Sequence, residues 1–147
     1  MGDIWLKSYP GGIAPTLDDA LQASLAEFIQ SACEKKPDDI AFESFGYQLT
    51  FREYYQKSAQ LAEYFQNTCQ LSKGDRIALV LPNVISYPVA LFAAFMAGLV
   101  VVNFNPLYTA REMSVQLKDA QVSAIVVLEN FAKTISVALE EMAPVPI

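Results

Sequence analysis

The sequence predicts an α/β protein built around a parallel sheet, and three features support this fold class. Residues 77–110 contain no Asp, Glu, Lys or Arg, so this stretch must be buried. Prolines, asparagines and a glycine divide it into segments of strand, helix and strand length. From residue 76 onward the predicted order is β-α-β-α-β-α, which is typical of parallel-sheet layers.

A membrane-spanning helix is the alternative for the uncharged stretch. Such a helix needs about 20 consecutive apolar residues, and residues 84–102 are long enough. However, Pro88 and Gly98 interrupt that segment, and no cluster of Lys and Arg flanks it. Residues 77–81 and 99–102 are short and mostly aliphatic or β-branched, as in strands covered on both faces. We therefore favour a buried β-α-β unit with a right-handed crossover.

The composition excludes several classes of protein. The net charge of -6 and the lack of a basic patch make nucleic acid an unexpected partner. The chain has no histidine, which excludes His-based catalysis and His metal ligands within it. Cys33 and Cys69 do not form a disulfide framework, and we expect buried, reduced thiols in a cytoplasmic protein. The N-terminus lacks the pattern of a secretory signal.

The expected organisation is an arm followed by an incomplete domain. Residues 1–20 predict an extended, turn-rich N-terminal arm whose aromatic residues dock on the domain or on a second subunit. Residues 21–147 predict an incomplete N-terminal α/β subdomain. Only 18% of the residues are charged, against about a quarter in a usual domain, which suggests that more protein covers one face. Because another strand is due near Ile147, we expect the C-terminus to be a cut inside the domain.

Three capping boxes predict where helices begin. In each, a Ser or Thr hydroxyl can accept from the backbone N–H three residues later, and a Glu at that position can reach back. The first helix should end before Pro37. Between the first two helices, residues 40–45 and 47–50 predict a hairpin around Gly46. The boxes are Ser24 with Glu27, Thr50 with Glu53, and Thr109 with Glu112.

The second helix carries an aromatic stripe that allows two interpretations. The stripe could be a shelf for a ligand, but at helical spacing it is more typical of a core face. We favour the core, with Leu49 and Tyr54 as a hydrophobic staple at the start of the helix. The residues of the stripe are Phe51, Tyr54, Tyr55, Ser58, Ala62 and Phe65.

The C-terminal half continues the alternation of strands and helices. Residues 72–75 predict a turn, and Asp75 and Arg76 predict a local ion pair at the start of the first core strand. Residues 123–128 predict another buried strand, and a last helix should begin at Asn130 or Phe131 and end near Met142.

The sequence lacks the motifs that carry common chemistry. None of its six glycines falls in GxGxxG or GxxxxGK[ST], so neither phosphate-binding loop is present. No Cys/His spacing suits a metal. Asp18 with Asp19 and Glu140 with Glu141 are adjacent acids that do not face each other on a helix, and we interpret them as solvated charges.

Five polar residues follow predicted core strands, at the edge where open α/β sheets bind ligands. They could contact a ligand, or they could be caps and turns. Asn83 fits a helix cap, Asn105 with Pro106 favours a turn, and Thr109 is already a cap. We therefore assign no catalytic, cofactor-binding or metal-binding residue to this chain. The five residues are Asn83, Asn103, Asn105, Tyr108 and Thr109.

Several segments resemble the N-terminal part of adenylate-forming acyl-CoA synthetases, and most closely the bacterial long-chain fatty-acid–CoA ligases. The Leu-Thr-Phe and Gly-Asp-Arg motifs are shared across that superfamily, whereas Tyr-Pro-Val-Ala-Leu-Phe and Asn-Pro-Leu-Tyr-Thr are more specific to the long-chain branch. The resemblance covers nearly all of this chain but well under half of the usual family length. The segments are residues 5–10, 49–52, 74–79, 82–83, 87–92, 97–98, 101–112 and 123–127.

The resemblance implies a partial N-terminal subdomain of the adenylate-forming enzyme fold. The full-length parent would use ATP, Mg and coenzyme A to convert a fatty acid to an acyl-adenylate and then to an acyl-CoA. The family's phosphate loop, ribose-binding acid and catalytic Lys would lie beyond Ile147, so this chain alone should be an inactive scaffold with no cofactor. The resemblance also implies a cytoplasmic parent, peripheral membrane contact and a homodimer through the N-terminal region.

Two other functions are consistent with the same residues. One is a stand-alone, non-catalytic binding or interaction module derived from this fold. The other is a different adenylate-forming ligase, such as an aryl-CoA ligase or a luciferase-like protein. The acyl-pocket residues that would separate the ligases are not in this chain.

Overall fold

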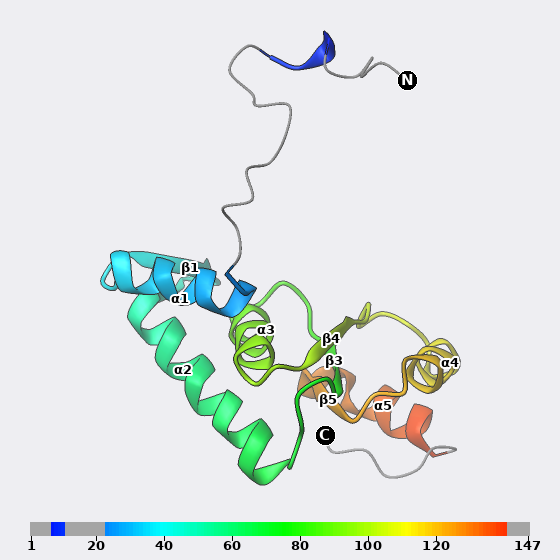
Figure 1. The fold of residues 1–147 in the computed structure, drawn as a ribbon. Coiled ribbons are helices and arrows are strands. Elements are labelled where there is room, and N and C mark those ends of the chain that lie inside the picture. Colours follow the sequence, from blue (N-terminus) through cyan, green and yellow to red (C-terminus); the bar gives the residue numbers. More distant parts are fainter. Residues whose placement is uncertain (1–6, 11–22, 141–147) are drawn as a thin grey trace.

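The computed structural model describes residues 7–10 and 23–140 of the chain (Figure 1). Most of the predicted N-terminal arm lies outside this part. The predicted end of the last helix at Met142 and the predicted cut near Ile147 lie outside it as well.

Two helices and a hairpin form the first layer of the molecule. Helix α1 (Leu25–Lys35) is followed by the antiparallel strands β1 (Ile40–Ser44) and β2 (Tyr47–Thr50) and by helix α2 (Phe51–Glu63). The last turn of α2 widens into a π-helical turn, η2 (Tyr64–Thr68). The antiparallel pairing of β1 with β2 confirms the hairpin predicted around Gly46.

The hairpin turns at Phe45 and Gly46, which both have positive φ angles of 51° and 78°. Two such residues in succession suit the two-residue turn that matches the twist of hairpin strands. Glycine takes this conformation freely, whereas a phenylalanine there is uncommon.

All three predicted capping boxes form. The hydroxyls of Ser24, Thr50 and Thr109 each accept from the N–H three residues on, and the glutamate at that position accepts from the cap's own N–H. The N–H-to-carboxylate distances are 2.7 Å, 2.9 Å and 2.8 Å. Each box pairs otherwise unsatisfied donors of a helix N-terminus.

A three-stranded parallel sheet forms the centre of the second half. Its strands are β3 (Arg76–Val80), β4 (Val100–Asn103) and β5 (Ala124–Val127), in the order β4-β3-β5. This confirms the predicted α/β class with a parallel sheet.

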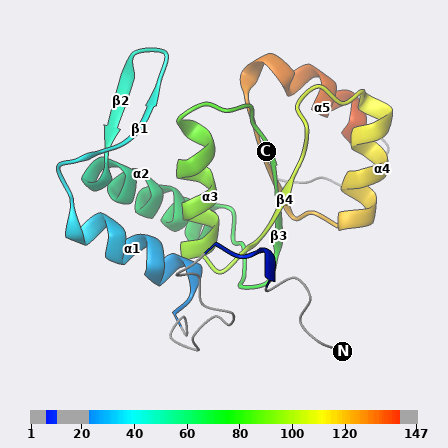
Figure 2. The same cartoon turned by 90° about the horizontal axis from the view of Figure 1, so that it is seen from above.

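The helices cover both faces of this sheet. Helix α3 (Ser86–Met96) lies on one face, between the sheet and the first layer, as Figure 2 shows. Helix α4 (Ala110–Ala120) and helix α5 (Ala132–Leu139), which follows the short helix η3 (Glu129–Phe131), lie on the other face. The connections β3-α3-β4 and β4-α4-β5 therefore run on opposite faces, as right-handed crossovers in opposite directions require.

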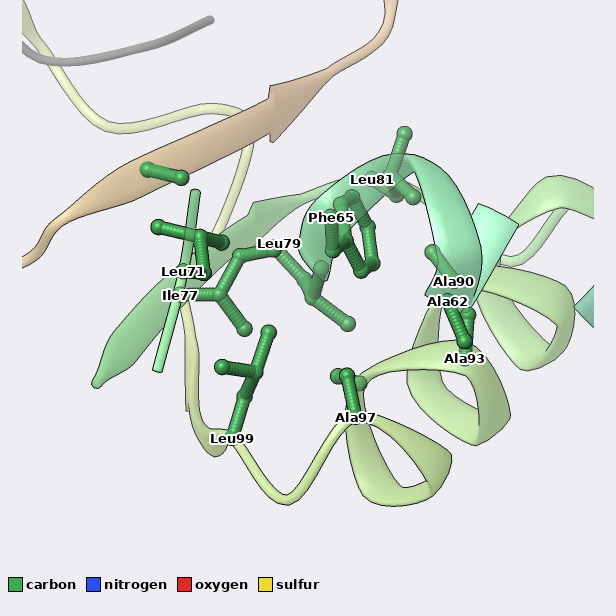
Figure 3. Close-up of a cluster of buried hydrophobic side chains, with 12 residues drawn as sticks. Ala62, Phe65, Leu71, Ile77, Leu79, Leu81, Ala90, Ala93, Ala97 and Leu99 are labelled. Carbon is green, nitrogen blue, oxygen red and sulfur yellow. The ribbon is translucent and has the colours of Figure 1, made fainter. Parts of the chain in front are cut away.

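Alternate side chains of β3 enter two separate cores. Ile77 and Leu79 point toward α3, where they meet the alanines of that helix (Figure 3). Ala78 and Val80 point toward α4 and α5. Because β3 is covered on both faces, all its central residues are apolar, as expected for a parallel strand.

Helix α3 explains why the uncharged stretch is so long. Its alanines pack against the sheet, and Phe92 packs in the first layer with Leu49 and Tyr54. A helix with apolar contacts all round is typical of a buried core helix. In residues 7–10 and 23–140, no helix combines the length and the apolar character needed to cross a membrane.

The aromatic stripe of α2 is a core face, as predicted. Tyr54, Ser58, Ala62 and Phe65 are buried, and the staple residue Leu49 is completely covered. The rings of Tyr54 and Phe92 lie 5.2 Å apart. The stripe therefore packs mainly into the protein core, against α3.

Two local predictions were wrong. Asn83 does not cap α3, because the helix begins at Ser86 and its N-cap is Ile85. Asp75 and Arg76 do not form an ion pair. The Asp75 carboxylate accepts from the N–H of Ser72 at 2.8 Å, and the Arg76 Nε donates to the carbonyls of Ala120 and Gln121 at 2.9 Å and 3.0 Å.

Candidate functional site

The carboxyl end of the sheet is the place where this fold would hold a ligand. The turns after β3 and β4 meet there, and the five polar residues predicted as ligand contacts lie in these turns. Their hydrogen bonds decide which of them remain available.

Three of the five residues are engaged in local structure. The Asn105 side-chain oxygen accepts from the N–H of Leu107 at 3.0 Å, which closes the predicted turn. Tyr108 packs beside the core under α4. Thr109 is committed to its capping box with Glu112. For these residues the interpretation as caps and turns is confirmed.

Asn103 is held by a partner that the sequence did not predict. The hydroxyl of Tyr87 on α3 donates to the Asn103 side-chain oxygen at 3.1 Å. This bond joins the first turn of α3 to the end of β4. It fixes the orientation of the amide but leaves the exposed Asn103 at the surface.

Asn83 is the residue of the five that has neither a side-chain hydrogen bond nor a place against the core within the described part of the chain. It is exposed and lies on the rim of a cleft of about 410 Å³. The cleft separates the β1–β2 hairpin from the start of α3, and its lining is mainly apolar. The lining residues are Phe42, Glu43, Ser44, Tyr54, Asn83, Val84, Ile85, Tyr87, Pro88 and Leu91.

The cleft lacks an arrangement for catalysis. Glu43 is the one charged side chain among its lining residues, which all belong to the described part of the chain, and it accepts from the Gln48 amide at 2.8 Å. Burial, with a smaller contribution from Cys33, raises the pKa of Tyr54 well above its ordinary value of 10.0. Tyr54 is therefore a neutral phenol, and its hydroxyl donates to the Pro88 carbonyl at 3.2 Å. The cleft can hold an apolar group, and the one carboxylate among its lining residues is hydrogen-bonded to Gln48 and not to a nucleophile.

The two cysteines are free thiols. Cys33 is buried, as predicted, but the prediction was wrong for Cys69, which is only half-buried at the end of η2. Burial raises the pKa of Cys33, which keeps the thiol protonated and unreactive at neutral pH. Neither residue forms part of a catalytic arrangement.

Phosphates do not fit the turns at Gly74 and Gly98. The N–H of Gly74 donates to the Gly98 carbonyl at 2.9 Å, and the N–H of Gly98 donates to Phe95 at 3.0 Å. Both amides are therefore committed to turns and are not available to cradle a phosphate. Within residues 7–10 and 23–140, no cluster of three or more His, Cys, Asp or Glu residues could hold a metal.

Sequence reasoning missed the part of the cleft that comes from the hairpin. Phe42 and Ser44 are far from α3 in the sequence, and no local pattern indicates that they face Asn83 and Tyr87. The structure alone shows the link, since the rings of Phe42 and Tyr54 meet edge to face with their centroids 5.0 Å apart.

The sequence model of the AMP-binding enzyme family matches residues 29–146. The chain belongs to this family.

A curated relative and two solved structures illustrate the similarity. A long-chain-fatty-acid–CoA ligase of Haemophilus influenzae is 44% identical over 135 residues, which are 92% of this chain and 24% of that protein. A luciferase-like enzyme of the mealworm Zophobas morio has the same fold with a TM-score of 0.79 and 23% identity, over 85% of this chain and 30% of that one. A benzoate CoA ligase of Burkholderia xenovorans LB400 has a TM-score of 0.78 and 22% identity, over 82% of this chain and 24% of that one.

The coverage is unequal in both kinds of comparison. This chain spans about a quarter of the length of the curated relatives that it matches. The structural similarities lie below 25% identity and establish the fold.

Proposed function

We propose that this chain is the N-terminal scaffold of a longer long-chain fatty-acid–CoA ligase. The observation that carries the proposal is the identity of 44% with such a ligase over 92% of this chain. The site-poor sheet edge supports the scaffold role, because the described residues supply neither a phosphate cradle nor a general base. The proposed division is an arm of residues 1–20 and an incomplete subdomain of residues 21–147.

The proposed reaction of the longer protein has two steps. A fatty-acid carboxylate is a poor electrophile, because oxide would have to leave. Attack of the carboxylate on the α-phosphorus of Mg-bound ATP releases pyrophosphate and gives an acyl-adenylate. The coenzyme A thiol then attacks the acyl carbon, and AMP leaves. The substrates of the parent are thus a fatty acid, ATP and coenzyme A.

In this proposal no catalytic, cofactor-binding or metal-binding residue lies within residues 1–147. The role of the chain is to supply one sheet layer and its covering helices, against which later segments assemble the sites. We also propose a cytoplasmic parent that touches membranes peripherally and pairs with a second copy through the N-terminal region. The source of its substrate in bilayers and the aromatic residues of the arm support these points.

Fatty-acid-dependent exchange of pyrophosphate into ATP tests the function. The parent should show exchange that is greatest with long-chain acids, compared with short and aromatic acids. The isolated chain should show none, because the amides of Gly74 and Gly98 are already bonded. Exchange by the parent with aryl acids alone would move the protein to the aryl-CoA ligases. Measurable exchange by the isolated chain would refute the scaffold role.

A further inference from the structure

The turn of the β1–β2 hairpin carries the most exposed large apolar side chain of the described residues. Phe45 has 96% of its surface open, compared with 79% for Leu107, the next in order. Figure 2 shows that this turn lies beyond α1 and α2. Residues 44–47 carry no charge, and 52% of the Tyr47 surface is also open. We call these four residues the aromatic tip.

The backbone at Phe45 is unfavourable for a residue of this type. Its φ angle of 51° lies in the left-handed region, which Gly, Asn and Asp adopt far more readily than a bulky residue does. In the described part of the chain, Phe45 belongs to none of the three buried clusters. Packing within this part therefore does not explain a phenylalanine at the turn, whereas a contact outside it would.

The size of the aromatic tip favours a lipid bilayer over a protein as the partner. An aromatic side chain buries about 150–250 Å², whereas a stable protein interface buries about 1,200–2,000 Å² in total. Phe45 and half of Tyr47 supply only a small part of such an area. A bilayer needs no matching surface, and it accepts aromatic rings at the level of its headgroups.

The charge of the chain indicates the kind of bilayer. The net charge is -6, so a surface of anionic lipids would repel the chain. The aromatic tip contains no Lys or Arg to offset this repulsion. Glu43, the nearest charged residue in the sequence, accepts from the Gln48 amide at 2.8 Å. We therefore expect a zwitterionic bilayer, with the burial of apolar surface as the driving force.

Apolar hollows lie on both sides of the hairpin. Ser44, which directly precedes Phe45, lines the cleft near Asn83. Tyr47 lines a second hollow of about 330 Å³, whose other walls come mainly from α2 and α3. Ile85 lines both hollows. Apolar surface therefore continues from the aromatic tip toward the start of α3, and a bilayer at the tip would lie close to both hollows.

We propose that the aromatic tip is a membrane anchor, which inserts the ring of Phe45, with Tyr47 beside it, into the interface of a zwitterionic lipid bilayer. The inference rests on the proposed function, in which the parent touches membranes peripherally, and it names the residues that make the contact. A small apolar anchor gives weak and reversible binding. The parent should therefore exchange between the bilayer and solution.

Sedimentation with phosphatidylcholine vesicles tests the proposal on the full-length parent. Phe45→Asn removes the ring but keeps a residue that readily adopts a positive φ angle, so the hairpin should remain folded. Its partition onto the vesicles should fall by about tenfold, because the variant buries no aromatic ring in the bilayer. Phe45→Trp should bind at least as well as the wild type, since Trp is favoured at membrane interfaces.

Phe28→Ala is the matched control, because it removes another exposed ring from a different element. Phe28 lies on α1, and 56% of its surface is open. Its removal should leave the partition onto vesicles almost unchanged. The melting temperature of each variant, measured without vesicles, reports on folding. Phe45→Asn should melt no lower than the wild type, because Asn relieves the unfavourable backbone.

The other outcomes would overturn the anchor. They are a parent that does not bind these vesicles, equal binding by Phe45→Asn, and an equal loss in Phe28→Ala. Binding that requires phosphatidylserine and ignores Phe45 would assign the contact to charge instead. A lower melting temperature of Phe45→Asn without vesicles would show that the ring packs against a later part of the parent, and would overturn the anchor too.

The readouts also separate this inference from the proposed function, because none of them depends on activity. A parent that binds vesicles through Phe45 but does not exchange pyrophosphate would refute the proposed function alone. A parent that exchanges pyrophosphate with long-chain acids but binds vesicles equally well without the Phe45 ring would refute the anchor alone.

Discussion

Thr109 shows how one residue fixes the start of a helix. Its hydroxyl accepts from the N–H of Glu112, and the Glu112 carboxylate accepts from the N–H of Thr109. Thr109→Ala should therefore lower the free energy of unfolding by about 1 kcal/mol, measured by urea denaturation. Thr68→Ala is the control, because Thr68 is exposed in η2, and it should change stability by less than about 0.5 kcal/mol. Equal losses would contradict the capping role.

The same cap predicts a dependence on pH. The N–H of Thr109, and then its hydroxyl, lower the pKa of Glu112 below its ordinary value of 4.5. Since the folded pKa lies below the unfolded one, the carboxylate stabilises the protein above pH 4.5. That contribution is lost as the pH falls through the folded pKa.

Glu112→Gln tests this sign. Wild type should be more stable than the variant at neutral pH, and the difference should shrink below about pH 4 in denaturation curves. Glu27 and Glu53 have pKa values lowered by the same cause, so their variants should behave alike. A difference that grows in acid would refute the assignment.

The capping boxes could be predicted from the sequence because both partners lie within three residues. The hydrogen bonds of Arg76 could not be predicted, because only the folded sheet brings its acceptors, the carbonyls of Ala120 and Gln121, close to it. The prediction that Asn83 caps α3 was wrong for a related reason. The turn after β3 is longer than the local pattern suggests, since α3 begins at Ser86 with Ile85 as its cap.

Among the elements, the end of α3 depends on one glycine. The N–H of Gly98 donates to Phe95, and the N–H of Leu99 donates to Ala94 at 2.8 Å. This pair of bonds ends the helix and needs a left-handed residue at position 98, where φ is +74°. Gly98→Ala should therefore cost about 1–2 kcal/mol in the free energy of unfolding.

Gly46→Ala separates the sources of this cost. Gly46 also has a positive φ of +78°, but an added Cβ would meet no atom within 4 Å. At Gly98 the added Cβ would lie 3.1 Å from the Lys73 Cγ. A larger loss at Gly98 would identify the contact as the extra cost, and unchanged stability of Gly98→Ala would contradict the motif.

The order of helices and strands followed from the spacing of apolar residues, because each element buries one or two faces with its own period. The π-helical turn η2 could not be predicted from this spacing. The N–H of Cys69 donates to Tyr64 at 3.0 Å, five residues back. This wider turn lets Phe65 and Leu71 both enter the core under α3. Whether the end of a helix widens in this way depends on which residues pack against it, and the local sequence does not specify them.

For the molecule as a whole, α3 joins two layers. One is the first layer of α1, α2 and the hairpin, and the other is the parallel sheet. Ala90, Ala93 and Ala94 let it approach the sheet closely, and Phe92 fills the space beneath the hairpin and α2. The sequence indicated that this helix is buried, because it lacks charge. It did not indicate which side meets which layer, so the cleft at Asn83 emerged only from the structure.

Phe92 therefore provides a test of how the layers are coupled. Its side chain is completely buried, and its ring lies 5.2 Å from Tyr54 and 6.2 Å from Tyr55. Phe92→Ala should cost about 3–5 kcal/mol, a large part of the stability of an ordinary domain, which is about 5–15 kcal/mol. Phe45→Ala is the matched control, since 96% of the Phe45 surface is exposed, and it should not destabilise the fold.

Hydrogen exchange in the Phe92→Ala variant shows where the loss falls. Because the removed ring contacts α2 and the hairpin core and not the sheet, exchange should rise most in α1 and α2. Strand β3, held by the alanine side of α3 and by α4 and α5, should keep more of its protection. Equal loss in both layers would mean that α3 transmits the defect and that the two layers unfold as a single cooperative unit.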